Sequence, residues 1–461
     1  MRPSQPKMSR SRSIASIQVL PVGQSGFGRG NDTELLTLNA DLEPSRPLPL
    51  AETGETSAKA WITVVGAFLF LFPSYGLMQS IGTIQSHLEL NQLSSYSSRD
   101  VGWIAGTFTS LAMFLGIQIG PMFDAYGPRV LGPIGCIIYI PTFFVLAECR
   151  VYWHFMLVLG VWGGTGAAIL SMVGVGIVGK WFVRRRGLAM GIALCGSSLG
   201  GVVLPLTLRS LLPSLGWAWA MRSLAFLLAA VMVAGAACLQ QSMPVVEAAS
   251  ENRRRKRVAL NFMALTSGTF TFVTIGLFAL EFAAFGVFSL LPTYATAANF
   301  PSDTGFGLVA VANAMSTAGR LLPGLAGDHF GHFNILLAMI LVTAIFTGAI
   351  LVPFGSSSLG ALYAFSALWG FGSGSFISLT PVCMGKTCES EDYGRYFGTM
   401  YFFVSFSLLI ASPLGGEMLQ NFGTRALACL YMSVVVAGGI AFLLARQLLY
   451  GKRGLGIREK I

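Results

Sequence analysis

Charged residues are scarce in this sequence. Only 11% of its 461 residues are Asp, Glu, Lys or Arg, and 54% are hydrophobic, whereas soluble domains carry about 25% charged residues. Such a chain cannot cover a globular core with a water-compatible surface, so a soluble fold is excluded and a membrane protein is indicated. Glycine, by contrast, is abundant at 55 residues, as expected where helices pack closely in lipid.

Histidine and cysteine are also few, and their spacing argues against catalysis and metal binding. Four histidines occur without HExxH, GxSxG or Cys/His metal spacing, so we expect neither an enzyme nor a metal site. The seven cysteines are scattered, which indicates small packing residues rather than disulfides. Gly385-Lys386-Thr387 lacks the earlier glycine of a phosphate loop, because Thr380 stands there, so no nucleotide cofactor is expected.

Long apolar segments are what the sequence does contain. Each is near the ~20 residues that a helix needs to cross a bilayer. They predict an all-α membrane protein of twelve transmembrane helices in two sets of six, at about residues 61–83, 101–123, 131–147, 156–179, 188–208 and 219–239, then 269–295, 306–327, 335–353, 359–383, 399–414 and 426–444.

The polar stretches around these segments define the domain organisation. Residues 1–60 mix Ser, Pro, Arg and acidic residues without an apolar signal segment, which predicts a disordered tail. Residues 61–243 and 269–445 are the two predicted bundles. Between them, 244–268 contains Arg253-Arg254-Arg255-Lys256-Arg257, a run no membrane helix tolerates, and 446–461 is a short tail.

The distribution of basic residues predicts the orientation. With both termini in the cytoplasm, about 24 of the 30 Lys and Arg residues lie on the cytoplasmic side, as the positive-inside rule requires. The net charge of +10 is then explained by loops that face anionic lipid headgroups, so no nucleic-acid partner is expected. We expect a multi-pass protein of the plasma membrane.

One motif, GxxxDxxG, occurs twice. It runs from Gly120 through Asp124 to Gly127, and again through Asp328, with the copies 204 residues apart, about the length of six crossings with loops. Each copy ends an apolar segment. The glycines permit a sharp turn, and the aspartate is expected to accept backbone N–H bonds from the next helix N-terminus and to pair with cations across the bundle.

The first copy continues to Arg129, and the resulting G-x-x-x-D-x-x-G-x-R resembles the signature of the major facilitator superfamily. Within it, the stretch Trp181-Phe-Val-Arg-Arg-Arg-Gly-Leu-Ala-Met-Gly191 is similar to the monocarboxylate porter family, particularly its fungal members. This resemblance implies the major facilitator fold, alternating access to a central cavity, and a small carboxylated cargo. It also implies gating by Gly120, Asp124, Gly127, Arg129 and Asp328.

The chain departs from animal members of that family at two charged positions. Gln79 stands where they carry a lysine, and Ser316 stands where they carry an aspartate, which argues against simple lactate–proton symport. The arginine of the eighth segment, Arg320, is retained. A guanidinium inside an apolar helix is retained to face a cavity or a partner, and its fork matches a carboxylate. Arg320 is therefore a candidate anion site, with a structural ion pair as the alternative.

Glu281 is the other ionisable residue predicted near mid-membrane. Desolvation favours a neutral acid there, which suits a proton carrier, so Glu281 is a candidate proton-coupling residue that could pair with Arg320. A structural pair or helix contact is the alternative. Further polar side chains that could line the cavity, or simply bond between helices, are Tyr75, Gln79, Asn313, Ser316, Thr380 and Tyr401.

Three functions remain open at this stage. The first is a secondary transporter of a small organic anion, with proton coupling undecided. The second is an efflux transporter of a fungal secondary metabolite, although the helix-five stretch Gly196-Ser-Ser-Leu-Gly200 lacks the proline common in drug–proton antiporters. A nutrient sensor on a transporter scaffold is the third and most remote.

Overall fold

The computed structural model describes residues 57–96, 98–239, 262–301 and 304–450, and their regular structure is helical. The predicted tail 1–60 lies almost wholly outside these ranges, as do most of the predicted linker 244–268 and most of the predicted tail 446–461. The last helix continues to Tyr450, past the predicted boundary at residue 445.

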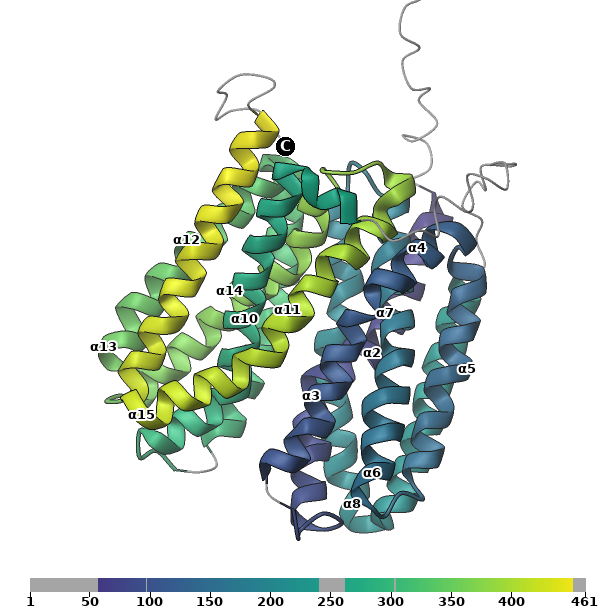
Figure 1. Ribbon diagram of the computed structural model, residues 1–461, viewed down its shortest axis with the longest axis vertical. Helices are drawn as coiled ribbons and strands as arrows, with labels where there is room; N and C mark the ends of the chain where they lie inside the picture. Colours follow the sequence, from purple (N-terminus) through teal and green to yellow (C-terminus); the bar gives the residue numbers. More distant parts are fainter. Residues whose placement is uncertain (1–56, 97, 240–261, 302–303, 451–461) are drawn as a thin grey trace, which may run out of the picture. The chain divides into compact units, whose positions relative to one another are not determined.

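The first six predicted crossings form one group of helices (Figure 1). Within this group, α2 and α8 pack against each other most extensively, although they are far apart in sequence. The elements are α2 (Ala58–Leu90), α3 (Ser98–Phe114), α4 (Gly116–Tyr126), α5 (Pro128–Leu146), α6 (Tyr152–Phe155), the π-helix η1 (Met156–Gly163), α7 (Gly164–Trp181) and α8 (Arg186–Cys238).

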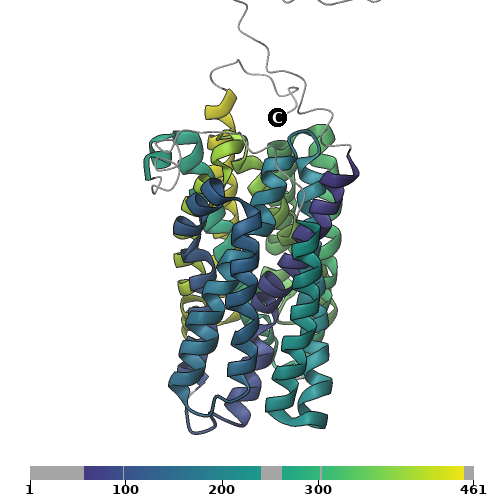
Figure 2. The ribbon, with the colours of Figure 1, turned by 90° about the vertical axis from the view of Figure 1, so that its right-hand side faces the viewer.

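The remaining helices form a second group, in which α10 packs on α15 and α11 packs on α14. Figure 2 shows helices of both groups running nearly parallel to one axis. The elements are the 3-10 turn η2 (Phe262–Thr266), α10 (Gly268–Ala297), α11 (Thr304–Phe330), α12 (His332–Phe346), the π-helix η3 (Thr347–Leu351), α13 (Val352–Phe354), α14 (Leu359–Met384), the 3-10 turn η4 (Ser390–Asp392) and α15 (Tyr393–Tyr450).

By length and composition, seven of the described helices are able to cross a membrane, or eight when α3 and α4, bent by 41° at their junction, count as one span. Two of the seven, α8 and α15, each join two helices at a kink. The part of α8 and of α15 beyond the kink can each count as a further crossing, and so can α11 and α14, which have 27 and 26 residues. The described helices are then compatible with the twelve predicted crossings.

Four glycines with positive φ mark equivalent points of the two groups. Gly127 and Gly331, the last residues of the two repeated motifs, have φ of 74° and 93°, and each separates one helix from the next. The kinks of α8 and α15 fall at Gly216 and Gly423, with φ of 73° and 83°. Residues with a Cβ rarely adopt this conformation, so both groups use glycine for the same turns.

Candidate functional site

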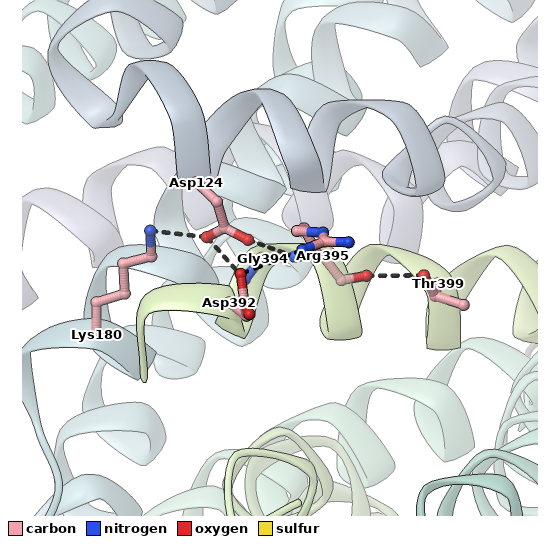
Figure 3. A network of polar contacts seen from close by, with 6 residues as sticks. All are labelled: Asp124, Lys180, Asp392, Gly394, Arg395 and Thr399. Carbon is pink, nitrogen blue, oxygen red and sulfur yellow. Dashed lines mark hydrogen bonds and ion pairs between the residues drawn. The ribbon is translucent and has the colours of Figure 1, made fainter. Parts of the chain in front are cut away.

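Asp124, in the last turn of α4, binds the start of α15 in the other group (Figure 3). Its Oδ1 accepts a hydrogen bond of 3.0 Å from the Gly394 N–H, and its Oδ2 accepts one of 2.6 Å from the Arg395 N–H. The Lys180 ammonium of α7 lies 2.7 Å from Oδ1. The carboxylate therefore satisfies two N–H groups that a helix N-terminus leaves without partners, and does so where Asp124 is only 7% exposed.

Asp328 makes the reciprocal contact from α11 to α8. Its two carboxylate oxygens accept bonds of 2.9 Å each from the N–H groups of Gly187 and Leu188. Here the neighbouring base is His332, whose Nε2 lies 2.8 Å from Oδ1. The two copies thus cap equivalent helices, but one is paired with a lysine and the other with a histidine.

The capped helices differ from the expectation. We predicted a bond to the next helix N-terminus, which for Asp124 is α5 and for Asp328 is α12, yet each aspartate caps a helix of the opposite group. The next helix after Asp124 opens with Pro128, which has no N–H to offer. Spacing along the chain carries no information on which distant helix end lies opposite a side chain.

The two groups also meet backbone to backbone at this end, called here the aspartate end after Asp124 and Asp328. A Cβ added to Gly120 would overlap the Gly394 carbonyl oxygen, and one added to Gly398 would overlap that of Gly116. On the other pair of helices, a Cβ on Gly324 would lie 2.6 Å from a backbone oxygen of α8. Glycine is therefore required for the closed contact of α4 with α15 and of α11 with α8.

Further cations surround the aspartate end. Arg186, the first residue of α8, donates from Nη2 to the Gly179 carbonyl at 2.6 Å and to the Ser390 hydroxyl at 3.4 Å. Burial lowers the pKa of Lys386, and the nearby Arg186 lowers it further, while Asp328 opposes the shift. Arg129, predicted in the gate, is exposed near the start of α5.

Arg320 lies on α11 and reaches across to α8. It is 1% exposed, and its Nη1 donates to the Leu194 carbonyl at 2.6 Å and to the Ser197 hydroxyl. Gln79 of α2 donates to the same hydroxyl at 3.4 Å. Among the contacts of the described residues there is no ion pair between Arg320 and Glu281. The guanidinium therefore ties the groups together, and its Nε has no hydrogen-bond partner among the residues that the structure describes.

A cavity lies between the groups, beside the glycine contact of α4 with α15. Its volume in this conformation is about 10 Å³, and it is bounded by four helices of the first group and by α15 of the second; the lining residues are Tyr75, Ala112, Met113, Gly116, Ala168, Ser171, Met172, Phe397 and Tyr401. Two predicted residues, Tyr75 and Tyr401, are among them. The predicted Gln79, Asn313, Ser316, Glu281 and Arg320 are not.

Sequence reasoning missed several residues of this arrangement. His332 stands four residues after Asp328, a spacing that could have been read as a pair, although a turn separates them. Lys180, Gly394 and Arg395 gave no signal, because nothing in sequence links them to Asp124. Phe397, Met113 and Met172 gave none either, since an apolar side chain facing a cavity is indistinguishable by type from one facing lipid. Among the described residues, no three His, Cys, Asp or Glu side chains meet to hold a metal.

Two helical groups that enclose a cavity and are fastened at one end by reciprocal caps define a membrane transport protein. The chain belongs to the Major Facilitator Superfamily, whose profile matches residues 62–324 and 317–455. The predicted all-α major facilitator fold and transport class are therefore confirmed.

Two relatives and one solved structure illustrate what the chain is similar to. It is 32% identical over 400 residues to the Riboflavin transporter MCH5 of Saccharomyces cerevisiae, covering 83% of this chain and 77% of the relative. It is 31% identical over 441 residues to the Agnestins efflux protein AgnL12 of Paecilomyces divaricatus, covering 95% and 98%. The crystal structure of the Major Facilitator Superfamily transporter FucP in the outward conformation shares the fold, with a TM-score of 0.66 and 13% identity over 84% of this chain and 99% of that one.

Proposed function

We propose that the protein is a secondary transporter that exports a small organic metabolite by alternating access. The observation that carries this proposal is the cavity between the groups, which is directly adjacent to the Gly116–Gly398 contact. A compound bound there touches both groups, so a change in how the groups meet would expose it at one end or the other. Riboflavin and agnestins, the cargo of the two relatives, are organic metabolites.

The structure has the geometry of one state in this cycle. Caps and glycine contacts fasten the aspartate end, and in alternating access a carrier closed at one end opens at the other. By the positive-inside rule we assign the aspartate end to the cytoplasm, with both termini on that side, and we assign the protein to the plasma membrane. The state described is then the outward-facing one, from which an exporter releases its cargo.

A second candidate is the transport of a monocarboxylate, as the porter resemblance implied. Arg320 would hold the carboxylate and Glu281 would carry a proton. The Nε of Arg320, which has no hydrogen-bond partner among the described residues, favours this candidate. Against it stands the binding of the same guanidinium to α8, and Arg320 lies outside the residues that line the cavity.

The two candidates are separated by transport in vesicles. The purified protein is reconstituted, and vesicles are loaded with riboflavin, lactate and an extract of fungal secondary metabolites under an imposed pH gradient of either direction. We expect mass spectrometry to show efflux of a metabolite larger than lactate. Movement of lactate alone, in step with the proton gradient, would support the monocarboxylate candidate instead.

Arg320→Gln discriminates between the two roles of the arginine. If Arg320 fastens α11 to α8, losing its charged bond to the Leu194 carbonyl shifts the balance of conformations, and turnover falls about tenfold with little change in KM. If Arg320 holds the cargo, KM rises instead. Ser197→Ala is the matched control, because it removes one acceptor of the guanidinium and leaves the carbonyl in place.

A further inference from the structure

Aromatic rings from both groups line the cavity. Tyr75 comes from α2, and Phe397 and Tyr401 lie one helical turn apart on α15, with ring centroids 4.5 Å apart. Tyr393 continues this column of rings, stacked on Phe397 at 5.9 Å. Ring faces of this kind attract other flat π-systems, in stacked or edge-to-face geometry.

The rest of the wall is small or pliable. Ala112, Gly116 and Ala168 of the first group have little or no side chain, which leaves a shallow surface facing α15. Met113 and Met172 add thioethers, which adapt their shape and pack well against ring edges. The volume open in this conformation is about 10 Å³, room for about one water molecule, so the walls must move apart before any cargo enters. A thin, flat compound needs less separation of these walls than a bulky one.

The charges around the cavity disfavour an anion. None of the described residues that line it carries a positive charge, and Ser171 with the tyrosine hydroxyls supplies its polar groups. Arg320 is turned toward α8 and bonded there. A carboxylate bound between the rings would therefore lack a cation among the residues that line the cavity.

From this geometry we infer that the cargo is a flat aromatic compound, bound in an uncharged form between Tyr75 of the first group and Phe397 and Tyr401 of the second. The inference rests on the proposed transport function and names the class of its cargo. Because the rings come from both groups, such a compound bridges the two bodies that must move relative to each other.

Three compounds with one carbon skeleton test this inference. Radiolabelled 2-naphthamide is bound to the purified full-length protein and displaced by unlabelled 2-naphthamide, by its saturated decahydro analogue, or by 2-naphthoate. Aromatic contacts on two sides predict that 2-naphthamide displaces the label at about tenfold lower concentration than the saturated analogue. The carboxylate is expected to be weaker than the amide. Equal displacement by the saturated analogue, stronger displacement by 2-naphthoate, or no binding at millimolar amide would overturn the inference.

Variants locate the effect. Phe397→Leu and Tyr401→Leu keep apolar volume but lose a ring, and each is expected to weaken 2-naphthamide binding about fivefold. Phe406→Leu on the same helix is the matched control, because Phe406 is 44% exposed and does not line the cavity. If only Phe406→Leu weakened the binding of 2-naphthamide, the assignment of the aromatic contacts to Phe397 and Tyr401 would be wrong. If vesicles transport metabolites without preferring aromatic ones, this inference is wrong and the proposed function stands. If the protein binds aromatic compounds selectively but transports nothing, the proposed function is wrong and the binding preference stands.

Discussion

Replacing Asp124 with alanine is expected to open the aspartate end and to abolish most transport. The substitution leaves the N–H groups of Gly394 and Arg395 and the Lys180 ammonium without their shared acceptor. Removing one partner from a buried charged network costs about 3–5 kcal/mol, so the closed conformation should lose at least about 100-fold in population relative to the open one. Turnover should fall by more than about tenfold.

The conformational shift is measured independently of transport. Spin labels replace Tyr126, exposed at the end of α4, and Glu389, exposed just before α15, and their separation is followed by electron paramagnetic resonance. The distance should lengthen in Asp124→Ala. Asp392→Ala is the matched control, since the side-chain bond of Asp392 among the described residues stays within its own group, to the Arg395 guanidinium at 3.4 Å (Figure 3). An unchanged distance with normal transport in Asp124→Ala would show that the cap does not hold the end closed.

Hydropathy indicated where the helices lie, but the predicted spans omitted the helix end that Asp124 caps. The eleventh span was predicted from residue 399, whereas α15 begins at Tyr393. The omitted turn contains Arg395 and has polar neighbours, so its composition does not suit a lipid-facing helix. That turn is the helix N-terminus that Asp124 caps. A helix end that is capped by another helix contains both polar and apolar residues, so a hydropathy window leaves it out of the predicted span.

The turns of the repeated motif could be predicted from sequence because they depend on the local conformation of its glycines. Gly127 and Gly331 take the positive φ that ends a helix and begins the next, and that need is visible in sequence. The partners of Asp124 and Asp328 are 270 and 141 residues away, so only the fold identifies them.

The free-energy cost of burying Arg320 predicts that it has a partner but does not identify the partner. Burial of a guanidinium in an apolar helix required a partner, and the structure provides one in the Leu194 carbonyl. Sequence could not distinguish that carbonyl from a carboxylate of cargo or from Glu281, because the direction in which a side chain points around a helix depends on packing. Tyr75 and Tyr401 were placed in the cavity wall by their polarity, and Phe397 was not, although its ring occupies the same wall.

Replacing Gly398 with leucine is expected to lock the aspartate end open and to stop transport. A Cβ at this position overlaps the Gly116 carbonyl oxygen, and backbone on both sides cannot rotate away as a side chain would. The two groups must separate to admit the side chain, so the closed state becomes inaccessible and turnover should fall more than about 100-fold, on the scale of several kcal/mol. Each group should still fold, because the contact lies between the groups.

The signature of this lock is binding without transport. The Gly398→Leu protein should retain binding of a cargo compound from the cytoplasmic side, show the lengthened distance between positions 126 and 389, and unfold at a temperature close to that of the unmodified protein. Gly106→Leu on α3 is the control for adding a leucine to a membrane helix, since nothing lies within 4 Å of a Cβ at Gly106. It should transport normally. Transport by Gly398→Leu at the unmodified rate would mean that the α4–α15 contact does not have to form during the cycle, and the alternating closure proposed for this end would then be wrong.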